Sequence, residues 1–108
     1  MDESEFSERV EKLFSQIEDV TDALDEDIEA MRSGNVLTLE SQNGEQVVIN
    51  SHAPSSEVWL ASRAKGVRFS YIDGQWRSSK GENLSIWDAL AQAVSYICGH
   101  TVVFNQKI

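Results

Sequence analysis

The spacing of apolar residues changes twice along this 108-residue chain, and that change restricts the possible folds more than any other feature. From residue 27 to residue 78 apolar positions recur every second residue, as in β-strands with one buried face. Asn43-Gly44 and Asp73-Gly74 favour the positive φ angles of tight hairpin turns. We therefore expect an antiparallel sheet of five to six strands, at residues 27–31, 36–40, 46–50, 57–62, 67–72 and 75–78.

A helical spacing of apolar residues flanks this region on both sides. The first helix is expected to start at a capping pair, Asp2 with Glu5, and to end near Asp22 to Leu24. The second should run from about Leu84 to Cys98. The apolar stripes are Phe6, Val10, Leu13, Phe14, Ile17 and Leu24 in the first helix, and Trp87, Leu90, Ala91, Val94 and Cys98 in the second.

This order of elements predicts the fold class. It is α+β, a two-layer sandwich in which the N-terminal and C-terminal helices pack on one face of the antiparallel sheet. Repeats and linkers are absent from the sequence, so a single domain over residues 1–108 is expected. Residues 101–104 should either add a short strand or pack against the helices.

The other face of the sheet should then be in contact with water. In the fourth strand Val58 and Leu60 are the natural inward pair, so Trp59 should point outward. An exposed tryptophan in the middle of a strand indicates a contact surface. Trp87, at the start of the second helical stripe, should instead belong to the core.

The formal net charge of −9 is concentrated in the first quarter of the chain. Residues 1–29 hold twelve acidic residues against Arg9 and Lys12, whereas residues 30–108 hold six acidic and seven basic residues. Such a surface repels phosphates and attracts cations and basic protein surfaces, so we expect no nucleic acid partner.

The sequence also predicts a cytoplasmic protein without a membrane partner. Its apolar stretches are all shorter than the roughly 18–20 residues that span a bilayer. The acidic N-terminus is unlike a signal peptide. The single cysteine, Cys98, cannot form an internal disulfide, which fits a reducing compartment.

The motifs of common catalytic sites, such as G-x-S-x-G, the P-loop and G-x-G-x-x-G, do not occur, so we expect no enzyme. Cys98 is expected to be a buried, inert core thiol rather than a nucleophile. His52 and His100 are expected in surface or capping roles, although either could assist a metal site. A structural zinc site lacks its four nitrogen or sulfur ligands.

The stretch EDVTDALDEDIE, residues 18–29, carries seven carboxylates and no basic residue. An EF-hand loop starting at Asp25 fails, because Ala30 occupies its sixth position and Val36 its twelfth. An open surface array remains, and its carboxylates suit hard cations with modest affinity and poor selectivity. The array consists of Glu18, Asp19 and Asp22 on the helix, and of Asp27 and Glu29 on one face of a strand. The alternative is a solvated face that only aids solubility.

Several blocks of the sequence occur in an order that is found in one family. They are the opening D-E-S-E-F, the acidic helix end with its edge strand, N-V-L-T-L-E, N-G-E-Q-V-V-I-N, S-S-E-V-W-L-A-S, Y-I-D-G-Q-W and a helix of the L-x-x-W-D-x-L type. Together they resemble the bacterial frataxin (CyaY-type) family over essentially the whole chain. The most specific block is Val47 to Ser62.

The resemblance implies an α-β-α sandwich that acts as an iron-binding regulatory adaptor of iron–sulfur cluster assembly. Such proteins bind Fe²⁺ or Fe³⁺ weakly on an acidic ridge, where other divalent cations can substitute. The implied ridge consists of Glu18, Asp19, Asp22, Asp25, Asp27 and Glu29, with Glu3 as an outlying member. Met31 and Arg32 depart from the family pattern and predict a ridge that is shorter at its strand end.

The resemblance also implies two partners. The cysteine desulfurase is expected on the ridge at Glu18, Asp19 and Asp22, and the iron–sulfur scaffold protein on the outer sheet face at Asn50 and Trp59. A monomer is expected, with iron-driven oligomers as a further form. The alternative is an iron storage or ferroxidase-type protein, which needs paired metals held between facing helices. A third reading, an acidic mimic of DNA, would spread its charge more evenly.

Overall fold

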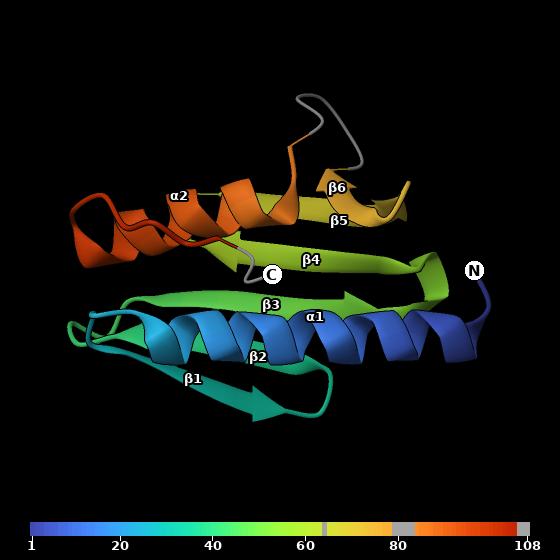
Figure 1. Ribbon diagram of the computed structural model, residues 1–108, viewed down its shortest axis with the longest axis horizontal. Coiled ribbons are helices and arrows are strands. Elements are labelled where there is room, and N and C mark those ends of the chain that lie inside the picture. The colour runs from blue at the N-terminus through green and yellow to red at the C-terminus, as the bar shows by residue number, and fades with distance from the viewer. Residues whose placement is uncertain (64, 79–83, 106–108) are drawn as a thin grey trace.

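Figure 1 shows one sheet with two helices lying over the same face. The computed structural model describes residues 1–63, 65–78 and 84–105. In chain order its elements are α1 (Glu3–Ala23), β1 (Ile28–Ser33), β2 (Val36–Ser41), β3 (Gln46–His52), the short 3-10 helix η1 (Ala53–Ser55), β4 (Glu57–Ser62), β5 (Gly66–Ile72), β6 (Gln75–Ser78) and α2 (Ile86–Cys98). The six strands are antiparallel in the order β1-β2-β3-β4-β5-β6, which confirms the predicted fold class.

The ends of the elements follow local chemistry. The carboxylate of Asp2 accepts a hydrogen bond of 2.8 Å from the Glu5 amide and so caps the start of α1, as predicted. In the β5–β6 turn, Asp73 and Gly74 have φ angles of +51° and +82°. Two consecutive positive φ angles are the signature of a type I′ hairpin turn, which fixes the register of the two strands.

The core lies between the sheet and the helices. Alternate strand residues face inward, and the most completely buried are Leu37, Leu39, Val47, Ile49, Val58, Leu60 and Phe69. They pack against the buried faces of both helices in one hydrophobic cluster. Within the described residues, neither helix combines the length and apolar character needed to cross a membrane.

The interpretation of the α2 stripe is wrong by about one residue. The buried positions are Ile86, Ala89, Leu90, Ala93, Val94 and Ile97, whereas Trp87, Ala91 and Cys98 are only partly buried. Ile86 and Ile97 are almost completely buried, so these two branched side chains define the face of α2 that points into the core. Cys98 consequently lies at the edge of the core, where partial burial raises the pKa of its thiol.

The buried tryptophan of the core is Trp76 and not Trp87. Trp76 on β6 is 6% exposed and packs edge-on against Phe6 and Tyr71, with ring centroids 6.1 and 5.2 Å away. Trp87 is half-buried and stacks on Phe104 at 6.1 Å. The prediction that Trp87 is a core residue therefore needs correction: it borders the core because the C-terminal tail, not the sheet, covers one side of its ring.

Residues 101–105 form no strand and pack against the helices through buried Val102 and Phe104.

Candidate cation-binding ridge and sheet-face docking surface

The second half of α1, the link that follows it and the edge strand β1 carry most of the predicted acidic ridge (Figure 1). Five of its carboxylates are exposed and have no ion-pair partner among the described residues. They are Asp19 and Asp22 on α1, Asp25 and Asp27 in the link, and Glu29 on β1. We call these five residues the open ridge.

Glu3 does not join this group. It is the first residue of α1, fifteen positions before Glu18. At 1.5 Å per residue the two Cα atoms lie about 22 Å apart along the helix axis. A single cation therefore cannot contact both ends of the predicted ridge.

Glu18 is in the predicted place, but its charge is already compensated. Arg32 on β1 donates a hydrogen bond of 2.7 Å to Glu18 from one terminal nitrogen and one of 2.7 Å to Glu11 from the other. The same guanidinium contacts the hydroxyl of Ser15 and lies 5.4 Å from the ring centre of Phe14. Arg32 therefore ties the edge strand to α1 and shortens the part of the ridge that is free to bind a cation.

The side chains of β1 alternate between the two faces of the sheet. Ile28, Ala30 and Arg32 face α1 and are partly buried, whereas Glu29 and Met31 are exposed on the outer face. Glu29 lies directly opposite Glu40 of β2, and like charges at such positions destabilise a strand pair. The open ridge thus wraps around the free edge of the sheet instead of running along one flat surface.

The ridge does not form a cage. Among the described residues, no group of three His, Cys, Asp or Glu side chains is arranged to hold a metal ion. A cation on this surface would take few protein ligands at a time, and water would complete its coordination.

Glu26 lies in the middle of the acidic run, but its side chain contacts the C-terminal region and does not join the open ridge. Both of its carboxylate oxygens lie 3.1 Å from Nε2 of His100, which follows α2. With Asp27, Asn43 and Cys98 this pair borders an open hollow of about 330 Å³. No sequence pattern links residues that are 74 positions apart, so this contact could not be predicted.

The outer face of the sheet presents Trp59 as predicted, half-buried among polar side chains. The His52 ring stacks on the indole at 4.4 Å, and the Arg68 guanidinium lies 4.6 Å from its centre. The indole Nε1 donates a hydrogen bond of 3.1 Å to Glu57. Asn50 is the direct cross-strand neighbour of Trp59 on β3. We call Asn50, His52, Trp59 and Arg68 the tryptophan patch. His52 and Arg68 are not among the residues predicted for this surface, although hairpin register could have located both.

The Arg32 contacts lead to a prediction about stability. Hydrogen bonds from Arg32, and secondarily from Ser15, hold the pKa of Glu11 below its ordinary value. A group with a lowered folded-state pKa stabilises the fold above its unfolded pKa and loses that contribution as pH falls through the folded value. Arg32→Gln should therefore lower the melting temperature by a few degrees at pH 7, and by less below about pH 4. Circular dichroism melts at both pH values measure this difference.

Arg63→Gln is the matched control, because the ion pair of Arg63 on the surface is with Glu45, which precedes β3, and not with a carboxylate of α1. It should change the melting temperature much less. If the effect of Arg32→Gln is equally large in acid, packing over Phe14 and not ion pairing explains the role of Arg32.

Comparison with known proteins gives a consistent set of similarities. Residues 1–100 match the family model of the frataxin-like domain. The chain is 38% identical over 105 residues to the iron-sulfur cluster assembly protein CyaY of Paraburkholderia xenovorans, covering 97% of this chain and 99% of the relative. It is 48% identical over 80 residues to the protein of the same name from Aliivibrio fischeri, covering 74% and 77%.

Solved structures extend these similarities to three dimensions. Frataxin from Psychromonas ingrahamii superposes with a TM-score of 0.88 at 28% identity, covering 98% of this chain and all of the other. Trimeric yeast frataxin complexed with ferrous iron superposes with a TM-score of 0.66 at 26% identity, covering 92% and 88%.

Proposed function

The chain belongs to the frataxin-like family, and on that premise we propose that it is an iron-binding regulatory adaptor of iron–sulfur cluster assembly. The proposal includes weak binding of Fe²⁺ or Fe³⁺, docking on the cysteine desulfurase, and no catalytic site of its own. It also includes a cytoplasmic location. The names of the relatives support a role in iron–sulfur cluster assembly. The surface chemistry of this chain supports the proposed cation binding and docking.

The observation that carries the proposal is the open ridge of Asp19, Asp22, Asp25, Asp27 and Glu29. Carboxylate oxygens are hard ligands that suit hard cations such as Fe³⁺ and Mn²⁺, and Fe²⁺ is only slightly softer. The five carboxylates are exposed and have no ion-pair partners among the described residues, so they make the local potential strongly negative. They would nevertheless supply only a few ligands to any one cation. Binding should therefore be weak, exchangeable and unselective, as suits a protein that passes iron on.

The same surface suits docking on a basic partner. Exposed charges of one sign accelerate association with a surface of the opposite sign, and salt weakens the effect. We propose Asp19 and Asp22 as the main docking residues for the desulfurase. Glu18 would contribute only after release from Arg32, since that contact occupies its carboxylate.

We propose the tryptophan patch as the surface for the scaffold protein. Trp59 is held by stacking and by its hydrogen bond to Glu57, so little conformational freedom remains to be lost when a partner binds. Rigid, half-exposed tryptophan and arginine are the residue types that most often dominate binding energy at protein interfaces.

Oligomer formation is a further part of the proposal. Solved yeast frataxin complexed with ferrous iron is trimeric, and that fact concerns the yeast protein. For this chain we propose a monomer that associates when iron neutralises the open ridge, because neutralisation removes repulsion between copies.

Anaerobic binding measurements test the proposal. Immobilised wild-type protein should capture the cysteine desulfurase at low salt and release it as salt is raised. In a separate experiment, paramagnetic Mn²⁺ should broaden backbone amide signals of residues 19–29 first. Early broadening at His52 or His100 would move the cation site, and failure to capture the desulfurase at any salt concentration would remove the adaptor role. An Fe²⁺ oxidation rate above that of iron in buffer would instead favour the ferroxidase alternative.

A further inference from the structure

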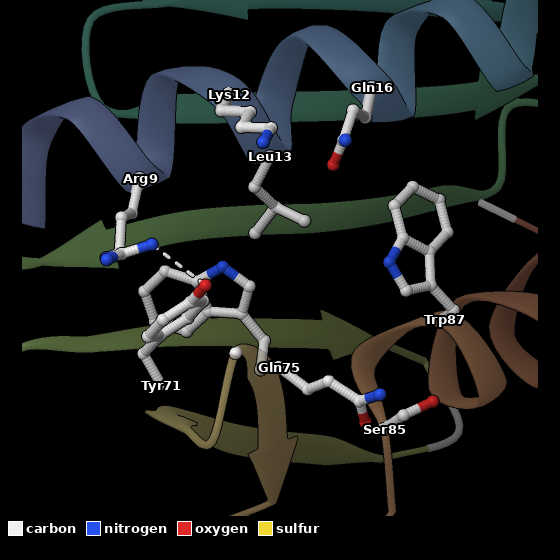
Figure 2. Close-up of a pocket in the computed structure, with 10 residues that line it drawn as sticks. Arg9, Lys12, Leu13, Gln16, Tyr71, Gln75, Ser85 and Trp87 are labelled. Carbon is white, nitrogen blue, oxygen red and sulfur yellow. Dashed lines mark hydrogen bonds between the residues drawn. The ribbon is translucent and has the colours of Figure 1, made fainter. Parts of the chain in front are cut away.

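A cavity of about 290 Å³ lies on the opposite side of α1 from the acidic ridge, between that helix and the β5–β6–α2 side of the molecule (Figure 2). Helix α1 lines it with Arg9, Lys12 and Gln16, among others, and β5 contributes Tyr71. Trp87 of α2 closes the other side. Its volume is near the lower limit for small-molecule pockets, enough for one ring system with one acidic group.

The charge of the lining is opposite to that of the protein. None of the ten residues that line the cavity is acidic, although 18 of the 108 residues of the chain are. Arg9 and Lys12, the two basic residues of the first 29, both line it. The cavity is therefore a local electropositive site on a strongly acidic molecule.

The two cations have different roles in this geometry. Arg9 is fixed: it donates a hydrogen bond of 2.8 Å to the Tyr71 hydroxyl and pairs with Glu5 at 3.2 Å. Lys12 is exposed, and none of the described residues forms an ion pair with it. Figure 2 shows the Lys12 ammonium and the Gln16 amide on the α1 side of the cavity, facing the space between Tyr71 and Trp87. Lys12 can thus pair with an incoming anion without giving up an internal contact.

Aromatic rings form the walls. Tyr71 packs edge-on against Trp76, with ring centroids 5.2 Å apart. Across the cavity Trp87 stacks on Phe104 and turns its indole nitrogen towards the space (Figure 2). Trp87 is thus only partly buried, and its indole N–H has no hydrogen-bond partner among the cavity-lining side chains that Figure 2 draws. Such walls suit a flat ring, which gains stacking energy in addition to the energy of its charge.

We propose that this cavity binds a small organic anion that carries a planar ring. Its carboxylate or phosphate group pairs with Lys12 and takes further donors from Gln16 and Arg9, while its ring lies between Trp87 and the Tyr71 side. This site is independent of the acidic ridge, so the proposal stands or falls separately from the function proposed above.

Nuclear magnetic resonance titration of the full chain tests the site. The probes are naphthalene-2-carboxylate, its neutral amide, phenyl phosphate and inorganic phosphate. The carboxylate should shift the Trp87 indole and Gln16 side-chain signals with a dissociation constant near or below about 1 mM, whereas the neutral amide should bind several-fold more weakly. Stronger binding of phenyl phosphate than of the carboxylate would assign the anion as a phosphate. Binding of inorganic phosphate as tight as that of phenyl phosphate would refute the role of the ring.

Variants assign the effect to Lys12. Lys12→Gln should reduce the affinity for the carboxylate roughly two- to fivefold, as expected for the loss of one exposed ion pair. Lys65→Gln removes the same charge at the other end of β5, outside the cavity lining, and should leave the affinity unchanged. Equal affinity for the carboxylate and its amide overturns the proposal, as does the absence of Trp87 shifts up to about 10 mM probe.

Discussion

Trp76→Ala should lower the free energy of unfolding by about 3–5 kcal/mol, whereas Trp59→Ala should lower it by less than about 1 kcal/mol. Trp76 is 6% exposed, and its ring joins the edge strand β6 to Phe6 of α1 and to Tyr71 of β5. Its removal leaves a cavity that backbone relaxation fills only in part. Domains of this size have total stabilities of about 5–15 kcal/mol, so this loss is a large share of the total and should clearly lower the urea midpoint.

Urea denaturation followed by circular dichroism measures both losses. Trp59→Ala serves as the control for removing an indole without opening the core, because Trp59 lies on the outer sheet face. Trp87→Ala should fall between the two, since its ring is half-buried and stacks on Phe104. A larger loss for Trp59→Ala than for Trp76→Ala would mean that the faces of the sheet are assigned the wrong way round.

These three tryptophans show how far the sequence could predict the fold. Trp59 was placed correctly, because Val58 and Leu60 on either side of it determine which face of the strand is buried. Trp76 was missed, because a strand of four residues contains too few apolar positions to decide its orientation. Trp87 was misplaced, because a rotation of α2 by one residue exchanges two nearly equivalent apolar stripes.

The candidate site shows a similar limit. Composition alone located the acidic run, and the two-residue repeat correctly placed Glu29 on the exposed side of β1. That repeat also turns Arg32 towards α1, but which carboxylates it meets depends on how the helix crosses the strand. Glu26 and His100 meet only because α2 ends beside the α1–β1 link. Such contacts between distant segments follow from tertiary packing, which single-sequence periodicity does not encode.

The substitution pair Asp19→Lys with Asp22→Lys should weaken capture of the cysteine desulfurase about 100-fold or more, which corresponds to about 2.7 kcal/mol. Both side chains are exposed on α1, and neither has an ion-pair partner among the described residues. Each substitution removes an attraction to a basic partner and replaces it with a repulsion. The fold should be retained or slightly stabilised, because cations near the C-terminus of a helix interact favourably with its dipole and relieve crowded negative charge.

Glu3→Lys with Glu8→Lys is the matched control, since it changes the net charge of the same helix by the same amount at its other end. Glu3 and Glu8 are also exposed, and both lie at least about 16 Å along the helix axis from Asp19, the first residue of the open ridge. Over that distance salt at about 0.15 M screens most of the interaction, so the control should bind the desulfurase nearly as well as wild type. Surface-binding measurements at two salt concentrations separate the two results. Equal losses in both variants would show that the partner responds to net charge alone, and the assignment of Asp19 and Asp22 as docking residues would then be wrong.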